Sequence, residues 1–209
     1  MTRPTLLQSI ILFLALAPLG LTGCAGLGND GGRLAATGEG DAGRVTLEGD
    51  FTTATYSLDG RNRATLVLID GPVEDPEQIV TIRLFWRPRA GKTPIDPNAT
   101  NAAIQYVIFD GDGGDVGIYT GAGFLFPRNK PNFDRFNGGL WQANLQLSAR
   151  TVGFKDLLGQ AHLSGDVKAT FDPIATETHL DRINRLITQR LGDPRLVNAA
   201  DTLASAGGS

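Results

Sequence analysis

The chain has 209 residues, one cysteine and a formal net charge of −3. This length suits one domain with a sizeable hydrophobic core, and a lone cysteine excludes an internal disulfide. A mildly acidic chain without a basic stripe also argues against a nucleic-acid partner.

Residues 1–23 have the composition of a secretory signal peptide. Arg3 is the only charged residue before Asp30, an apolar run follows it, and the segment ends in small residues. The continuous apolar run over residues 10–17 is far shorter than the ~20 residues that a membrane-spanning helix needs. The sequence therefore predicts a cleaved signal rather than a retained transmembrane helix.

The cysteine lies at the end of this signal, in the stretch Leu21-Thr22-Gly23-Cys24, which resembles the lipobox of bacterial lipoproteins. A buried structural cysteine is the alternative, but no strand or helix pattern surrounds Cys24. The resemblance covers residues 1–24 only and recognises no family for the rest of the chain. It implies cleavage before Cys24 and covalent attachment of diacylglyceryl and acyl groups, such as palmitate, to this residue.

The lipobox resemblance also implies a location. The lipid on Cys24 would anchor the protein to a membrane of the cell envelope and is the only cofactor that we expect. Because Ala25 follows the cysteine, the implied membrane is the outer one if the organism has one. Otherwise it is the extracytoplasmic face of the plasma membrane.

Residues 24–43 are rich in glycine and contain almost no large apolar side chains. Such a composition cannot bury enough apolar surface to offset the entropy of ordering. We therefore expect a flexible tether between the lipid anchor and a single β-rich domain over residues 44–199.

Within that domain, hydrophobic residues alternate with polar ones at a period of two, which is typical of strands with one buried face. The clearest example places Trp141 on the same face as Ala143, Leu145 and Leu147. Residues 64–69 are apolar on both faces and predict a central strand, and a phase change near Thr52 predicts a bulge. Seven or eight strands indicate an all-β fold, an antiparallel β-sandwich, with a small up-and-down β-barrel as the alternative.

One amphipathic helix is expected at the C-terminal end of the domain. Residues 178–181 fit a capping box, and the apolar stripe that follows predicts a helix over about 179–191. We expect Leu180, Ile183 and Ile187 to pack on the β-domain, the alternative being a helix kept for a partner. Residues 200–209 are expected to be a disordered tail.

The sequence Asp110-Gly111-Asp112-Gly113-Gly114-Asp115 places three carboxylates in six residues. Calcium prefers six to eight oxygen ligands, so Asp110, Asp112 and Asp115 form a candidate metal loop. The loop lacks the fifth- and twelfth-position ligands of an EF-hand, however. We expect a polar hairpin turn rather than a tight metal site.

The strand after this turn carries Gly117, Tyr119, Gly121 and Gly123 on one face. Glycines within a strand often mark a close approach by another group. The group could be the chain's own helix or loop, which we favour, or a ligand on a shallow surface formed by Tyr119, Gly121 and Gly123.

Catalytic motifs are missing from the sequence. It contains no strained-elbow serine, no set of paired His and Cys ligands and no phosphate-binding glycine loop. We therefore expect a noncatalytic envelope lipoprotein with a structural or interaction role, and an envelope protein or a glycan as its partner. The alternative is a module that binds a glycan or an apolar ligand on a sheet face or in a barrel interior; an enzyme ranks third.

Overall fold

The computed structural model describes residues 31–40, 43–88, 100–110, 114–129 and 134–192. The signal peptide, Cys24, Asp112 and the predicted tail over 200–209 lie outside these residues. The described residues form nine strands and one helix. In chain order they are β1 (Gly32–Gly40), β2 (Gly43–Phe51), β3 (Thr53–Leu58), β4 (Ala64–Asp70), β5 (Gln78–Leu84), β6 (Ala102–Asp110), β7 (Asp115–Pro127), β8 (Arg135–Arg150), β9 (Gln160–Phe171) and α1 (Pro173–Leu191).

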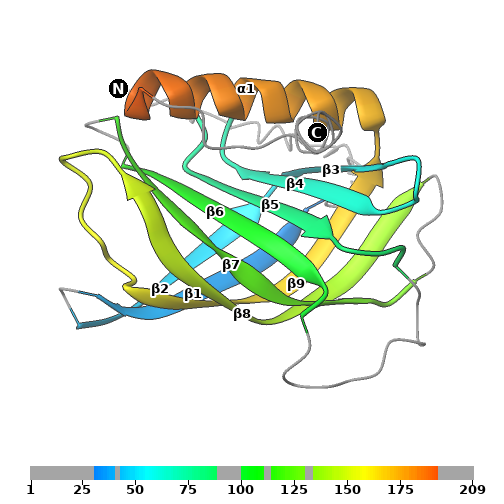
Figure 1. The fold of residues 1–209 in the computed structure, drawn as a ribbon, viewed down its shortest axis with the longest axis horizontal. Coiled ribbons are helices and arrows are strands. Elements are labelled where there is room, and N and C mark those ends of the chain that lie inside the picture. Colours follow the sequence, from blue (N-terminus) through cyan, green and yellow to red (C-terminus); the bar gives the residue numbers. More distant parts are fainter. Residues whose placement is uncertain (1–30, 41–42, 89–99, 111–113, 130–133, 193–209) are drawn as a thin grey trace, which may run out of the picture.

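The nine strands form one sheet in the order β2-β1-β9-β3-β4-β5-β6-β7-β8, and β9 pairs with β8 as well. The sheet curves back on itself, so that β1 and β2 cross behind β5, β6 and β7 (Figure 1). Two layers of strands thus face each other across a common core. The prediction of an all-β, sandwich-like fold with one C-terminal helix is confirmed.

Three details of the strand arrangement differ from the prediction. There are nine strands in the described part of the chain rather than seven or eight. The sequence pattern did not predict β1, and the strand is interrupted at Thr52, which separates β2 from β3. The order also differs from the up-and-down arrangement that was the alternative, because β9 lies between β1 and β3. The sheet is also not purely antiparallel, since β3 and β9 run parallel where Thr55 faces Thr170.

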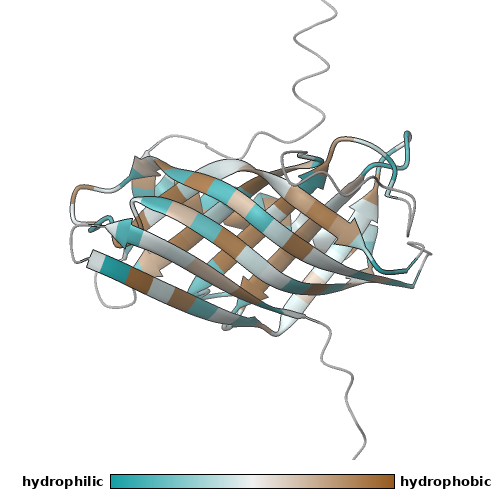
Figure 2. Ribbon diagram, turned by 90° about the horizontal axis from the view of Figure 1, so that it is seen from below, coloured by the Kyte–Doolittle hydropathy of each residue, from teal (hydrophilic) through white to brown (hydrophobic). Residues whose placement is uncertain are grey.

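The main core lies between the two layers and follows from the period-two pattern. Hydrophobic and polar residues alternate along the strands (Figure 2), and the hydrophobic positions of facing strands meet inside. The largest fully buried side chains of this core are Tyr56, Tyr106, Tyr119, Phe51, Phe136, Leu34, Leu66, Leu68 and Ile82. Because they leave almost no accessible surface, this interior is filled by the protein itself.

Strand β4 confirms the prediction of a central strand with two apolar faces. Leu66 and Leu68 point into the main core. Val67 and Ile69 point the other way, into a second buried cluster. A strand that is buried on both faces needs a cover on its outer side, and helix α1 supplies it.

Helix α1 covers the outer side of the sheet, as predicted (Figure 1). Ile183 and Ile187 are buried, and Leu180 is half-buried against the same cluster. Their partners are Val67, Ile69, Ile79, Val107, Val116 and Ile118 of strands β4 to β7.

The helix begins earlier than the sequence pattern suggested. Asp172 is its N-cap, with a side-chain oxygen that accepts a hydrogen bond from the Ala175 backbone N–H at 2.8 Å. Pro173 follows in the first turn, where its missing N–H is tolerated. The predicted capping box therefore lies inside the helix, where the Thr178 hydroxyl donates to the Ile174 carbonyl at 2.8 Å.

The prediction of a flexible tether over residues 24–43 is wrong for Gly32–Gly40, which is strand β1. It pairs with β2 on one edge and β9 on the other, and Leu34 and Ala36 are buried in the main core. Gly38 lies so close to the Leu158 carbonyl that a Cβ atom would collide with it. Here glycine permits close packing of the backbone rather than flexibility.

The docking of α1 predicts unequal effects for two isoleucines of the same helix. Ile187 is 0% exposed and Ile174 is 80% exposed. Ile187→Ala should lower the free energy of unfolding by about 2–5 kcal/mol, because it leaves a cavity under the helix. Ile174→Ala is the matched control and should change stability little. Urea denaturation of both variants measures this, and equal losses would contradict the buried position of Ile187.

Candidate functional site

Asp110 and Asp115 end the two strands of the β6–β7 hairpin, where they pair directly with each other across the ladder. The Asp115 carboxylate is engaged within the protein, since it accepts a hydrogen bond from the Thr151 hydroxyl at 2.6 Å. That hydroxyl oxygen in turn accepts from the Val116 N–H at 3.0 Å. Among the described residues, no group of three or more His, Cys, Asp or Glu side chains is arranged to hold a metal ion.

Tyr119 does not form an open platform. Its side chain is fully buried in the main core, and the Phe154 ring lies edge-on to it with a centroid distance of 6.5 Å. The same Phe154 ring lies against Gly117, leaving no room there for a side chain. The segment between β8 and β9 therefore covers this part of β7.

The two other glycines of this surface lie against the neighbouring strand. A Cβ atom on Gly121 would collide with the Asn144 carbonyl, and one on Gly123 would meet Ala143 at 2.6 Å. The surface considered for a ligand at Tyr119, Gly121 and Gly123 is thus occupied by the protein's own groups. The favoured explanation, close approach by the chain itself, accounts for the glycines.

The hydroxyl of Tyr119 donates to Asp156 Oδ1 at 2.6 Å. Burial raises the pKa of Tyr119, and the hydrogen bond to Asp156 raises it further. Burial also raises the pKa of Asp156, but hydrogen bonds from Tyr119, Gly159 and Leu158 outweigh it and hold this pKa below its usual value. A protonated tyrosine thus donates to an ionised carboxylate, which fixes the β8–β9 connection over the core.

The exposure of Trp141 differs from the prediction made for β8. The alternation placed it with the buried Ala143, yet its side chain is 63% exposed. The register of β8 against β9 shifts between Leu140 and Ala143, so both Trp141 and Gln142 lie outside. Gln142 has φ 41°, a left-handed conformation that a residue other than glycine adopts at some energetic cost.

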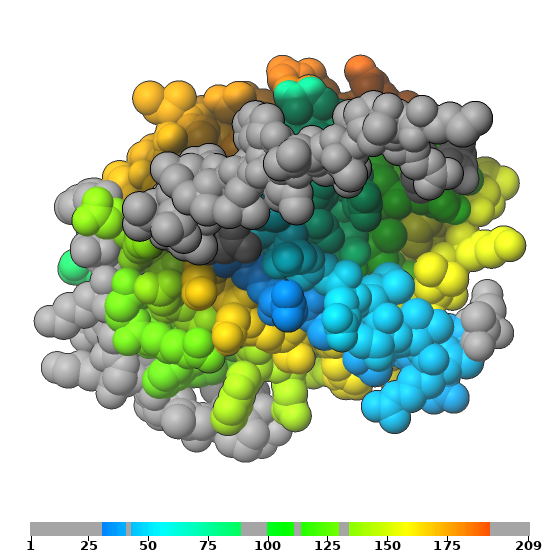
Figure 3. Space-filling model, turned by 180° about the vertical axis from the view of Figure 1, so that it is seen from behind, coloured from blue at the N-terminus to red at the C-terminus, as the bar shows by residue number. Residues whose placement is uncertain are grey.

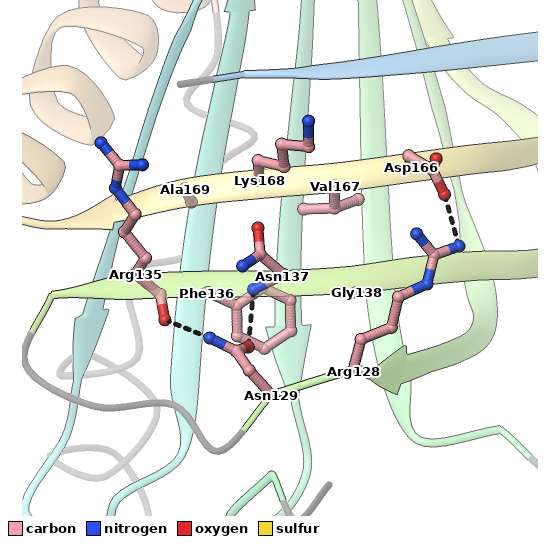
Figure 4. A pocket seen from close by; sticks show the side chains of 10 residues that line it. All are labelled: Arg128, Asn129, Arg135, Phe136, Asn137, Gly138, Asp166, Val167, Lys168 and Ala169. Carbon is pink, nitrogen blue, oxygen red and sulfur yellow. Dashed lines mark hydrogen bonds and ion pairs between the residues drawn. The ribbon is translucent and has the colours of Figure 1, made fainter. Parts of the chain in front are cut away.

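A groove of about 520 Å³ lies further along the same outer face (Figure 4). The two residues after β7, the start of β8 and the second half of β9 contribute its lining. The lining residues are Arg128, Asn129, Arg135, Phe136, Asn137, Gly138, Asp166, Val167, Lys168 and Ala169. In Figure 3, residues near the β7–β8 connection (light green) lie beside gold residues of β9, away from helix α1.

One side of the groove is held by an ion pair between Arg128 and Asp166, with Nη2 and Oδ1 2.6 Å apart. The arginine must cross β8 to reach β9, and Gly139 makes room for it. A Cβ atom on Gly139 would lie 3.3 Å from Arg128 Nη2. The missing side chain at position 139 therefore lets Arg128 lie flat on the sheet.

Asn129 fixes the other side of the groove by extending the ladder beyond β7. Its Oδ1 accepts from the Asn137 N–H at 2.9 Å, and its Nδ2 donates to the Arg135 carbonyl at 2.9 Å. Figure 4 shows Lys168 and the Asn137 amide between Arg135 on one side and the Arg128–Asp166 pair on the other. The groove therefore presents several hydrogen-bond donors from β8, β9 and the segment that follows β7.

Sequence patterns alone did not indicate this groove. Asp166 and Lys168 alternate with hydrophobic residues along their strand, but such outward positions are usually just solvated. Arg128 and Asp166 are 38 positions apart, and only strand pairing brings them together. The exposed Trp141 was missed because a bulge of one residue reverses the face of a side chain.

Comparisons with known proteins add no relative: no protein-family model, no curated protein and no solved structure matches this chain. Within the described residues, no helix combines the length and the apolar character needed to cross a membrane.

The Tyr119–Asp156 hydrogen bond predicts a pH-dependent effect of Tyr119→Phe. The variant should lose about 1.5–3 kcal/mol of stability at pH 7, as expected for a hydrogen bond to a charged group. Because the pKa of Asp156 is lowered by folding, its contribution is present above the unfolded value near pH 4 and is lost as pH falls through the folded pKa. The difference between wild type and variant should therefore shrink in acid.

Tyr106→Phe is the matched control for this measurement. Tyr106 is equally buried, but its hydroxyl donates to the neutral Gln78 Oε1 at 2.6 Å. The stability lost in Tyr106→Phe should not shrink in the same way when thermal unfolding is followed between pH 7 and pH 3. A Tyr119→Phe penalty that stays constant over this range would show that the ionised Asp156 is not the partner.

The loop over residues 110–115 predicts a negative result with calcium. Melting curves with and without millimolar calcium should nearly coincide, because Asp115 already has a partner in Thr151. A tight site at 100-fold saturation would instead add ~2.7 kcal/mol of stability. A calcium-dependent rise of several degrees in the melting temperature that disappears in Asp112→Ala would instead show that this loop binds calcium.

Proposed function

We propose that this chain is a lipoprotein of the bacterial cell envelope, anchored through lipid on Cys24, with a noncatalytic structural or interaction role. The observation that carries the proposal is the lipobox-like stretch Leu21-Thr22-Gly23-Cys24 at the end of a signal-like segment. The apolar stripe of helix α1 packs on the protein's own sheet, so contact with a partner would use another surface.

The position where β1 starts limits the distance between the folded domain and the proposed lipid anchor. Strand β1 begins at Gly32, eight positions after Cys24. Even a fully extended chain spans at most ~3.3–3.6 Å per residue, so the link is no longer than about 28 Å. A domain anchored through Cys24 would therefore stay close to the membrane surface, where its partners must also lie.

A second candidate function is a binding module on the outer face of the sheet. The main core is filled by large side chains such as Tyr56, Tyr106 and Tyr119, which are at most 1% exposed. An interior ligand has no room beside them. The outer face instead carries Trp141 on a bulge, next to a groove lined by charged and amide groups, and bulges often re-aim side chains at binding sites.

Lipidation is tested on the protein in the membrane fraction of a bacterial host. Wild-type chain should begin at Cys24 and carry the added mass of acyl groups, measured by mass spectrometry of the N-terminal peptide. Cys24→Ser should remain unprocessed and lack this mass, because the serine hydroxyl does not replace the thiol in lipid transfer. A mature N-terminus at another residue, with an unmodified Cys24 thiol, would rule out the anchor.

A further inference from the structure

The groove between β7, β8 and β9 is positively charged in a chain that is negative overall. Its ten lining residues include three cations, Arg128, Arg135 and Lys168, and one carboxylate, Asp166. That carboxylate is already neutralised by Arg128 at 2.6 Å. An anionic group that enters the groove therefore meets the charge of Lys168 and no uncompensated carboxylate among the lining residues.

Two donors in the groove have no partner in the described part of the chain. Lys168 is exposed and makes no ion pair there. The side-chain amide of Asn137 makes no hydrogen bond there either, although its backbone N–H is satisfied by Asn129. Figure 4 shows these two side chains close together between the flanking arginines, so both can donate to one bound group.

Trp141 extends this surface with an aromatic ring. It follows Gly139, over which Arg128 lies, by two positions of β8, or about 7 Å along the strand. Its cross-strand neighbour on β7 is Phe124, whose side chain is buried and supports the outer surface there. The indole is exposed because of a bulge with a left-handed Gln142, an unusual local geometry that binding surfaces often contain.

We propose that this groove binds an acidic saccharide. Lys168 contacts the carboxylate of the sugar, Asn137 donates to a ring or hydroxyl oxygen, and Trp141 packs on the apolar face of a neighbouring ring. The volume of about 520 Å³ lies within the range of pockets that hold small ligands. The proposal specifies the ligand class of the second candidate function and rests on that function.

An acidic saccharide fits this surface better than a lipid bilayer does. The donors line a hollow formed by β8, β9 and the segment after β7, whereas a bilayer surface is contacted by groups that protrude. The Asn137 amide can satisfy hydroxyl oxygens, which are abundant in sugars and scarce at a phospholipid surface. Because Asp166 is paired with Arg128, the hollow keeps a positive charge although it contains a carboxylate.

The test is calorimetric titration of the full chain, purified in a nonionic detergent, with an oligogalacturonate. A maltooligosaccharide of equal length is the neutral control ligand, and glycerol phosphate represents a phospholipid headgroup. We expect the oligogalacturonate to bind, the neutral sugar to bind at least 10-fold more weakly, and affinity to fall as salt is raised.

Two variants and their matched controls locate the site. Lys168→Ala and Trp141→Ala should each weaken binding about 10-fold, the size expected when a charged or aromatic contact is removed. Lys155→Ala and Trp86→Ala remove an exposed lysine and an exposed tryptophan elsewhere and should leave affinity unchanged. All four side chains are on the surface, so unchanged melting curves will confirm that the variants fold.

The outcomes separate this proposal from the functions on which it builds. Binding of glycerol phosphate without oligogalacturonate would overturn it in favour of a lipid headgroup. Equal binding of neutral and acidic sugars would overturn the acidic class while keeping a binding module. No binding of any ligand, or binding that ignores Lys168 and Trp141, would overturn the site, and the lipid anchor on Cys24 would remain untouched because it is measured separately.

Discussion

Strand β9 is paired on both edges, and the rest of the fold depends on this pairing. One edge meets β8 from Gln160 to Thr170, while the other meets β1 and then, beyond the start of β1, β3. The β9–β8 pairing brings β8, the last strand of the order, back to β9, so that hydrophobic residues of distant strands face a common interior. Strand β1 has β2 on its other edge, so the pairing with β9 is what hydrogen-bonds β1 and β2 into the rest of the sheet.

The closure of the sheet decides which surfaces remain available. The inner faces of the strands are buried in the main core, and the outer faces of β4 to β7 are covered by helix α1. The outer face around β8 and β9 has no such cover in the described part of the chain. It is there that polar side chains, the Arg128–Asp166 pair and the exposed Trp141 gather.

This division of surfaces is compatible with an anchored domain that acts by contact. A packed interior and a helix docked on its own sheet make a stable body whose variable part is its outer face. If Cys24 carries lipid, the short link before Gly32 holds that body near the membrane. A shallow outer groove then samples whatever envelope components lie close to the same surface.

The local chemistry of the sequence was sufficient for much of this fold. Alternation along the chain predicted the strands, the two apolar faces of residues 64–69 predicted a covered central strand, and the apolar stripe with Ile183 and Ile187 predicted a docked helix. These properties depend on neighbours within one or two turns or strand repeats, so they can be read from the sequence itself.

Other features were decided only when strands from distant parts of the chain came together. From its sequence, Gly38 could belong to a flexible tether or to a tightly packed strand. Only the folded structure places β9 and the Leu158 carbonyl against it. The alternation predicts a buried Trp141, but a bulge in β8 relative to both β7 and β9 exposes it. Tyr119 is covered because Phe154 and Asp156 fold back over it. The groove likewise requires that Arg128 and Asp166 meet across Gly139, because strand register is set by non-local pairing that no local period records.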